Sequence, residues 1–202
     1  MTSVKYVGFV VGSTRTTRLG PFITKYLQEK MAPHCRSAQF STVDLATFPL
    51  PLYDEPVMPG KQPAEDPTPH YEHNFTRQWS AEVLKYDALV FVTPQYNWSV
   101  PAGLKNALDY LYHEWKGKPA GIVSYGGRGG DKAATHLRDI LNGLRMQVLT
   151  AAPALSTSST MLPYIVEHGA VSDEDKARWE ASGANLNVEN LAQELAQKLS
   201  LV

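Results

Sequence analysis

A glycine, several hydroxyl side chains and two arginines stand together at residues 12–18, GSTRTTR, directly after the apolar run Val7–Val11. A helix that begins after such a turn offers unpaired N–H groups and about half a positive charge, and both bind anions. Arg15 and Arg18 add permanent charges, and Ser13 adds a hydroxyl donor. The stretch predicts a site for an anion such as a phosphate monoester. A solvated turn with two surface arginines is the alternative.

Two familiar phosphate-binding patterns do not describe this stretch. It lacks the lysine of a GxxxxGK[ST] loop and the spacing of a GxGxxG loop. A low-molecular-weight phosphatase is also excluded, because its C-x5-R motif needs a cysteine. Six residues after Cys35, the single cysteine, stands Ser41.

A second candidate segment follows the apolar run Ala88–Val92. It places two amides and two aromatic rings next to a proline, in the order Pro94, Gln95, Tyr96, Asn97 and Trp98. Amides pair well with a ring that bears carbonyl and N–H groups, and aromatic side chains supply a stacking wall. A core position would explain the two aromatic residues, but it would not explain the amides.

A third candidate segment is the glycine cluster GGRGG at 126–130. Gly126 and Gly127 would let the backbone approach a flat ligand closely. Ser124 and Tyr125, which come just before them, could bond to it or stack on it. An ordinary helix-entry loop would look the same.

Alternating strands and helices would position these segments. Three short valine-rich runs, bounded by glycine, proline or polar residues, predict buried strands. A weaker strand and a last strand are expected as well, and helical spacing of apolar residues predicts the helices. The expected strands are 7–11, 39–45, 88–92, 120–123 and 147–151, and the expected helices start near Pro21, Phe75, Pro101 and Asp131. The helix from Pro101 is expected to extend to Trp115, and a C-terminal helix is expected near 186–200.

This alternation predicts an α/β fold, a doubly wound five-stranded parallel sheet with helices on both faces. Ligands in such sheets bind beyond the carboxyl ends of the strands, where the strand order reverses. If the first, third and fourth strands are neighbours, the three candidate segments converge on one crevice.

Two segments do not fit regular structure. Residues 49–70 hold half of the 14 prolines, which indicates a long ordered loop or a mobile arm. Residues 153–167 are also irregular but more apolar, and they should pack against the rest of the chain. Further on, Ser172 and Asp175 resemble a capping box that begins a short helix.

Composition narrows the functional classes. A chain of 202 residues suits a single domain, 1–202. Its formal net charge of −1 gives no broad electrostatic field to attract nucleic acid or a membrane. The lone Cys35 and the absence of a signal-peptide pattern favour a cytoplasmic protein. The six histidines show no metal-binding spacing, so no metal site is expected.

The three segments GSTRTTR, TPQYNWSVPAGLKNALDYLYHEW and SYGGRGG together resemble the NAD(P)H-dependent FMN reductase family of the flavodoxin-like fold, closest to its fungal quinone reductase members. The resemblance extends over about residues 4–150. It implies that FMN is the cofactor and that NADPH or NADH is the electron donor. The implied acceptor is a quinone or a flavin-like small molecule.

The family's site residues can be placed on this sequence. The resemblance assigns the cofactor's phosphate to Ser13, Arg15 and Arg18, and its ring to Pro94–Trp98 and to the loop of Tyr125, Gly126 and Gly127. It also implies a homodimer or a dimer of dimers, with the loop around Tyr53 as a wall from the partner chain.

The expected reaction is ping-pong hydride transfer, in which the cofactor supplies the chemistry. No catalytic acid, base or nucleophile is therefore assigned. His113 and Glu114 fall in the helix expected after the middle segment, where a surface or packing role is expected. The alternative functions are a non-enzymatic flavodoxin-like electron carrier, which would usually be more acidic, and a flavin-binding redox sensor.

Overall fold

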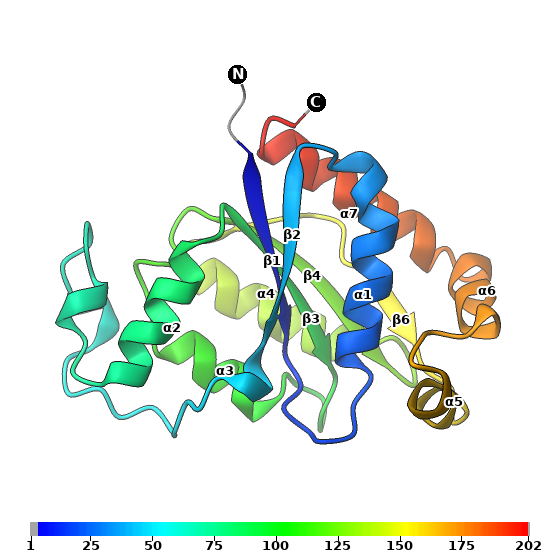
Figure 1. Ribbon diagram of the computed structural model, residues 1–202, viewed down its shortest axis with the longest axis horizontal. Coiled ribbons are helices and arrows are strands. Elements are labelled where there is room, and N and C mark those ends of the chain that lie inside the picture. Colours follow the sequence, from blue (N-terminus) through cyan, green and yellow to red (C-terminus); the bar gives the residue numbers. More distant parts are fainter. Residues whose placement is uncertain (1–3, 202) are drawn as a thin grey trace.

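A parallel sheet forms the centre of the protein in a computed structural model that describes residues 4–201 (Figure 1). Its strand order is β2-β1-β3-β4-β5, every neighbouring pair is parallel, and β6 also pairs with β4. The strands are β1 (Lys5–Val11), β2 (Ala38–Asp44), β3 (Ala88–Pro94), β4 (Pro119–Gly126), β5 (Gln147–Val148) and β6 (Ala154–Ser156). The order reverses direction between β1 and β3, which confirms the predicted doubly wound sheet.

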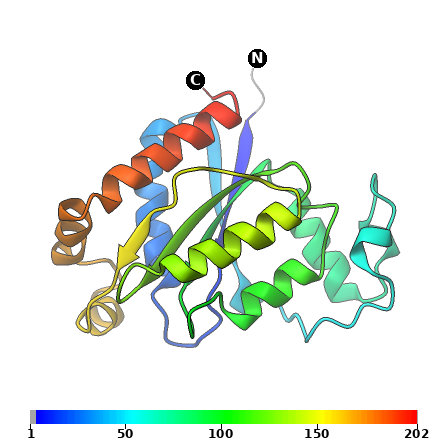
Figure 2. The ribbon, with the colours of Figure 1, turned by 180° about the vertical axis from the view of Figure 1, so that it is seen from behind.

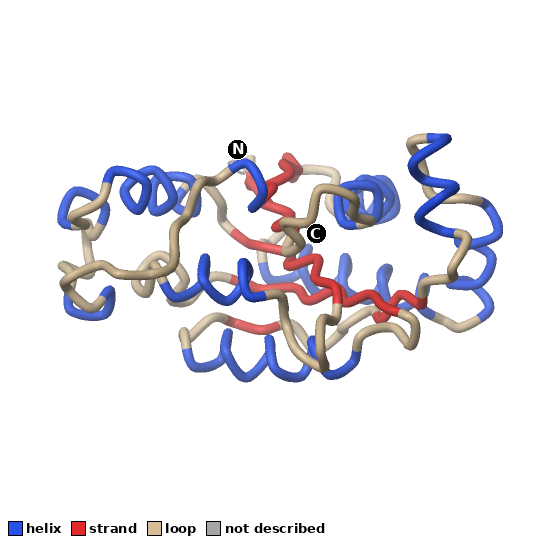
Figure 3. The backbone as a smooth tube through the Cα atoms, turned by 90° about the horizontal axis from the view of Figure 1, so that it is seen from below, coloured by secondary structure: helices blue, strands red, loops and turns tan. Residues whose placement is uncertain are grey.

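Helices cover both faces of this sheet, as the view from behind and the view from below show (Figures 2 and 3). The helices are α1 (Gly20–Met31), α2 (Asn74–Leu84), α3 (Ala102–Asp109), α4 (Asp131–Gly143), α5 (Met161–His168), α6 (Asp173–Ala181) and α7 (Ala184–Lys198). The side chains of α1, α5, α6 and α7 join one apolar cluster, and those of α2, α3 and α4 join another on the opposite face.

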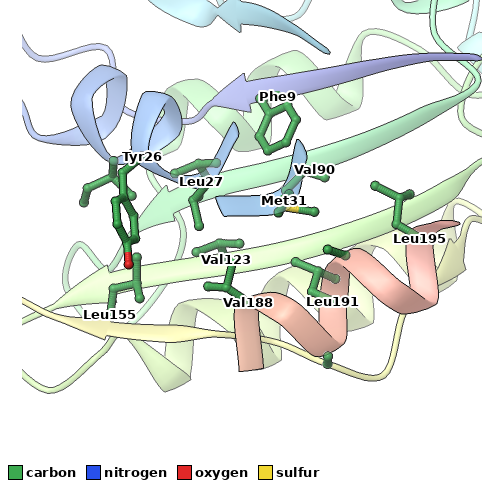
Figure 4. Close-up of a cluster of buried hydrophobic side chains, with 14 of the residues drawn as sticks. Phe9, Tyr26, Leu27, Met31, Val90, Val123, Leu155, Val188, Leu191 and Leu195 are labelled. Atoms are coloured by element: carbon green, nitrogen blue, oxygen red, sulfur yellow. The ribbon is translucent and has the colours of Figure 1, made fainter. Parts of the chain in front are cut away.

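The first cluster packs α1 and α7 against the middle of the sheet (Figure 4). Val188, Leu191 and Leu195 lie on one stripe of α7 and are fully buried, as the sequence spacing predicted. They face strand residues such as Val90 and Val123. Burial of one such side chain stabilises the fold by roughly 1.5 to 3 kcal/mol.

The second cluster is built around two tryptophans. Trp79 of α2 donates its indole N–H to the carbonyl of Ala107 at 2.8 Å, and Trp115 donates to that of Leu108 at 3.2 Å. Both rings are buried, so these bonds satisfy N–H groups that would otherwise be costly. They fix α3, and therefore the loop that precedes it, against α2 and the sheet.

The helix that begins after Pro101 is shorter than predicted. α3 ends at Asp109, although Leu111 and Trp115 are buried as their spacing suggested. The hydroxyl of Tyr110 donates to the carbonyl of Pro51, and the Glu114 carboxylate accepts the N–H of Tyr112. One tertiary bond and one local bond thus stabilise a turn where the pattern alone favoured another helical turn. The prediction that His113 and Glu114 lie in this helix is therefore wrong.

The fifth strand is split. β5 covers only Gln147–Val148 beside the start of β4, and β6 covers Ala154–Ser156 beside its end. The strand expected over 147–151 is thus too long at its carboxyl end. The expectation of an irregular segment at 153–167 is also wrong, since it contains β6 and α5. This segment does pack as expected, because Leu155, Met161 and Ile165 are buried.

The proline-rich segment 49–70 is an ordered loop that packs against the protein. Asn106 of α3 bonds to both the Pro51 carbonyl and the Tyr53 N–H, at 2.6 and 2.9 Å. The buried Glu55 carboxylate accepts the N–H groups of Glu72 and His73, the two residues that directly precede α2. Backbone groups that would otherwise lack partners are thus satisfied by side chains of distant elements.

The start of α6 has the cap that the sequence predicts. Ser172 accepts the N–H of Asp175 at 3.0 Å and donates its hydroxyl to the same residue's carboxylate, so the predicted cap at the start of α6 is confirmed. Within residues 4–201, none of the helices combines the length and apolar character required to cross a bilayer.

Candidate functional site

The three candidate segments meet at one edge of the sheet. They follow β1, β3 and β4, which are adjacent in the sheet, so their carboxyl ends lie side by side. A cavity of about 170 Å³ lies between them. Its lining residues are Arg15, Thr17, Arg18, Leu19, Pro94, Gln95, Tyr96, Tyr125, Gly126, Thr157 and Leu162.

The first loop turns sharply between the end of β1 and α1. The Gly12 N–H bonds to the Val92 carbonyl, which keeps the loop against β3. Ser13 is fully buried, and its hydroxyl lies 2.8 Å from that of Tyr96. Arg15 is exposed at the mouth of the cavity. Its charge is therefore available to a ligand, whereas the Ser13 hydroxyl already links the first loop to the second.

Arg18 is bound within the protein at both terminal nitrogens. One donates to the carbonyl of Arg15 at 2.8 Å, and the other donates to the Asp44 carboxylate at 2.5 Å. Its Nε is buried and has no hydrogen-bond partner among residues 4–201. An unpaired buried donor is costly unless a ligand accepts its hydrogen bond.

The second loop is attached to the start of α4. The side-chain oxygen of Gln95 accepts the N–H of Lys132 at 3.0 Å and that of Ala133 at 3.4 Å. Gly130, the residue that directly precedes α4, has no side chain to serve as a cap. Gln95 therefore acts as the cap of this helix, and its amide is held in a defined orientation at the cavity wall.

Asn97 and Trp98 form the outer turn of the same loop. Both have positive φ, 46° and 68°, which is uncommon for residues other than glycine. The turn is closed by paired backbone hydrogen bonds between Tyr96 and Ser99. The Ser99 hydroxyl also lies 3.0 Å from Nδ1 of His136 in α4. Trp98 is 67% exposed. These residues lie beside the cavity rather than in its lining.

The third loop forms the base of the cavity. The buried hydroxyl of Ser124 donates to the carbonyl of Gly129 at 2.8 Å, so it supports the loop from behind. Gly130 has φ of 82°, and a Cβ there would lie 3.0 Å from the Tyr125 carbonyl, so glycine is required. Gly126 lines the cavity, whereas Gly127 is not among the lining residues.

Tyr125 places a hydroxyl in the cavity near the start of α1. The side chain is 4% exposed, and its hydroxyl has no acceptor among residues 4–201, while the Gly20 N–H lies close to its oxygen. Burial raises the pKa of this phenol, while the nearby Arg18 and Arg15 oppose the shift. The group is thus a neutral donor at physiological pH.

Of the residues proposed from sequence, the cavity brings seven together, and they are Arg15, Arg18, Pro94, Gln95, Tyr96, Tyr125 and Gly126. Sequence reasoning missed Leu19, and it missed Thr157 and Leu162, which come from the segment that begins with β6 and continues into α5. The N–H of Thr157 bonds to the Gly126 carbonyl at 2.9 Å. Only the apolar character of that segment indicated that it packs on the protein, and nothing in it indicated the cavity.

The arrangement suits a ligand with an anionic tail and a flat polar ring. The cavity brings two arginines and the residue that precedes α1 together with Gln95, Gly126 and the unpartnered hydroxyl of Tyr125. A larger groove of about 480 Å³ between Leu45–Pro51 and α3 has no charged side chain in its lining. Within residues 4–201, no group of three or more His, Cys, Asp or Glu could hold a metal ion.

Comparison with known proteins is consistent with this geometry. The model of a family described as NADPH-dependent FMN reductase matches residues 5–160. The chain is 44% identical over 149 residues to the NAD(P)H-dependent FMN reductase LOT6 of Saccharomyces cerevisiae, covering 71% of this chain and 76% of that protein. It is 36% identical over 129 residues to a quinone reductase of Pseudomonas putida, covering 61% of each.

A solved structure resembles the whole fold. It is FerB, a flavoenzyme NAD(P)H:(acceptor) oxidoreductase from Paracoccus denitrificans, with a TM-score of 0.70 and 23% sequence identity. The similarity covers 96% of this chain and 99% of that one. At this identity the likeness concerns the fold alone, and it agrees with the parallel sheet described above.

Proposed function

We propose that this chain, which belongs to the NADPH-dependent FMN reductase family, reduces quinones or free flavin by ping-pong hydride transfer. It is an NAD(P)H-dependent oxidoreductase that uses FMN. The observation on which the proposal depends is the cavity itself. It joins Arg15, Arg18 and the unpartnered Tyr125 hydroxyl to the wall formed by Gln95 and Gly126. A doubly charged phosphate and a flat ring need these two ends in one pocket.

We assign the phosphate of FMN to the loop after β1. Arg15 supplies an exposed charge, Arg18 supplies its free Nε–H, and the Tyr125 hydroxyl supplies a neutral donor. Ser13 is fully buried behind this loop and bonds to Tyr96. Its hydroxyl can join the phosphate only by exchanging or sharing that bond.

We assign the ring of FMN to the other two loops. Pro94, Gln95 and Tyr96 line one wall, and Gly126 lines the base. Gly127, Asn97 and Trp98 lie next to this space, where they can contact the exposed edge of a ring that extends beyond the cavity. Ser124 acts from below through its bond to Gly129.

The chemistry at this site comes from the cofactor, since bound FMN can accept hydride from a nicotinamide and pass the electrons to an acceptor. The residues of the chain bind the cofactor and orient it. Gln95 is fixed by the start of α4, so its amide presents the same edge to the ring throughout. Leu162 and Leu19 add apolar surface that excludes water from part of the cavity.

We also propose a homodimer. Leu52 is 85% exposed, and Val57, Met58 and Trp98 are exposed as well, which leaves apolar surface on the proline-rich segment and on the second loop. Tyr53 is held against Tyr110 and Asn106 of its own chain. Leu52 is therefore the better candidate for contact with a partner chain. The cytoplasmic location stays a prediction from the sequence.

Steady-state kinetics of the purified, FMN-loaded protein test the proposed reaction. NADH and NADPH are varied at several fixed concentrations of a benzoquinone, and then of free FMN. Parallel double-reciprocal lines are expected, because donor and acceptor would occupy the same space in turn. Intersecting lines would argue for two separate sites, and the absence of turnover with either acceptor would contradict the proposed acceptor class.

A further inference from the structure

An ion pair joins the end of β2 to the loop that follows β1. Asp44 is the last residue of β2 and lies opposite Val11 in the sheet register. Its carboxylate accepts from Arg18 at 2.5 Å, and the two side chains are only 21% and 15% exposed. The pair is therefore sheltered from solvent, in contrast to the exposed pairs that contribute little.

The Asp44 carboxylate is itself held in place. Its other oxygen accepts the N–H of Ala46 at 3.1 Å, and its backbone carbonyl accepts the hydroxyl of Thr47 at 2.8 Å. The side chain is thus fixed by a short turn at the strand end. A fixed acceptor restricts the orientation of the long arginine side chain that bonds to it.

Arg18 passes this restriction to the loop. Its second terminal nitrogen donates to the carbonyl of Arg15, three residues earlier, at 2.8 Å. Because the guanidinium is planar, these two bonds also decide where Nε points. Nε is buried, has no partner among residues 4–201, and belongs to a residue that lines the cavity.

We propose that Asp44 is a positioning residue for the FMN phosphate, acting through Arg18. It sets the guanidinium so that the Arg15 carbonyl is held and the Nε–H is left to donate to the phosphate. The inference rests on the proposed phosphate site. Nothing in the family comparison assigns a role to Asp44, which lies on a strand that carries none of the three candidate loops.

The negative charge of Asp44 also acts on FMN binding in the direction opposite to its positioning of Arg18. A carboxylate near a phosphate repels it, so removal of the charge by itself would tighten binding. In the structure, however, the carboxylate touches Arg18, and the field of such a pair falls off faster with distance than that of a free charge. The positioning of Arg18 should therefore outweigh the repulsion between Asp44 and the phosphate. Loss of the Asp44 charge should weaken FMN binding if positioning dominates and tighten it if repulsion dominates.

The test compares FMN with riboflavin, which has the same ring and no phosphate. Flavin is removed from the full-length protein, and both ligands are titrated by fluorescence. Asp44→Asn keeps an oxygen for the Ala46 N–H but loses the charge that binds Arg18. We expect its dissociation constant for FMN to rise about tenfold, as for loss of one charge-assisted bond, and that for riboflavin to stay unchanged.

Two further variants complete the design. In an Arg18→Ala background, Asp44→Asn should no longer weaken FMN binding and should leave it unchanged or slightly tighter, because the proposal routes the positioning effect of Asp44 through Arg18 and only the repulsion then remains. Asp87→Asn is the matched control. Asp87 also pairs with a basic side chain, Lys5, and also accepts a backbone N–H, but its pair is more exposed and lies at the opposite end of the sheet. It should leave both dissociation constants unchanged.

Several outcomes would overturn the proposal. One is that Asp44→Asn binds FMN as tightly as the wild-type protein, or more tightly. Another is that Asp44→Asn weakens the binding of FMN and of riboflavin equally. A third is that Asp44→Asn weakens FMN binding just as much in the Arg18→Ala background. If Asp44→Asn does not fold, Arg18→Lys replaces it, because lysine has one nitrogen in place of the fork and no Nε–H. Unchanged FMN affinity in that variant would likewise overturn the proposal. A wild-type protein that binds FMN no tighter than riboflavin would instead contradict the phosphate site itself.

Discussion

The side-chain oxygen of Gln95, at the start of the second loop, accepts the N–H of Lys132 in the first turn of α4 at 3.0 Å. One residue thus joins the wall of the cofactor cavity to the start of a helix. The bond with Ala133 reinforces this link. The position of the loop is therefore coupled to the integrity of α4.

We expect Gln95→Ala to reduce the free energy of unfolding by about 1 kcal/mol, the usual cost of a lost helix cap. Gln95→Glu retains the acceptor and places a negative charge at the amino end of α4, which should preserve or raise stability by some 0.3 to 1 kcal/mol. Urea unfolding followed by circular dichroism measures both. Gln193→Ala, an exposed position on α7, is the control, and an unchanged stability of Gln95→Ala would contradict the capping role.

Arg15→Ala should weaken FMN binding strongly, because the exposed guanidinium faces a doubly charged phosphate in the proposed site. The loss of a charge-assisted bond costs about 1.5 to 3 kcal/mol. The dissociation constant should therefore rise between roughly tenfold and more than a hundredfold. Arg36→Ala removes an exposed arginine far from the cavity and serves as the control. Equal FMN affinity of the Arg15 variant would remove this residue from the site.

Glu114→Ala should destabilise the protein and loosen the proline-rich segment. The buried carboxylate accepts from Ser80 at 2.6 Å and from Tyr71 at 3.2 Å, and Ser80 also bonds to Thr68 in that segment. Leaving these donors without an acceptor should cost about 2 to 3 kcal/mol. Urea unfolding measures the loss, and faster proteolytic cleavage within 49–70 reports the loosening. Glu65→Ala, exposed in the same segment, should change neither.

Leu52→Asp should weaken the proposed homodimer. A carboxylate in an apolar contact must lose its hydration, so the association constant should fall while the monomer fold is retained. Light scattering during size-exclusion chromatography, repeated over a range of protein concentrations, gives the mass. Leu186→Asp places the same charge at an exposed leucine of α7 and is the matched control. A monomeric wild-type protein would contradict the dimer outright.

Cys35 should react slowly with thiol reagents in the folded protein. Burial raises the pKa of this thiol to about 11, and its sulfur lies 3.5 Å from the carbonyl of Ala192. Thiolate is the reactive form, so the modification rate at pH 8 should be far below that of the urea-unfolded chain and should rise toward pH 11. Absorbance with an aromatic disulfide reagent follows the reaction. A rate equal to that of the unfolded chain would mean that Cys35 is accessible.

Local patterns were enough to predict most of the fold. Valine-rich runs identified the strands that form the centre of the sheet, and the stripe of Val188, Leu191 and Leu195 identified α7. These signals succeed because burial on both faces of a strand, or on one face of a helix, depends on neighbouring residues. Patterns failed where distant contacts decided the outcome. α3 ends at Asp109 because Tyr110 and Glu114 bond elsewhere, and β5 is interrupted before β6.

The sequence by itself determined the order of the elements other than β6 and α5, the three loops and the family, since each is written in short contiguous stretches. Only the tertiary structure decided how those loops are used. It assigned the oxygen of Gln95 to α4 and a terminal nitrogen of Arg18 to Asp44, and it brought Thr157 and Leu162 to the cavity. The physical reason is that a hydrogen bond or cavity wall requires partners separated by many residues, and no local pattern records which partner the folded chain supplies.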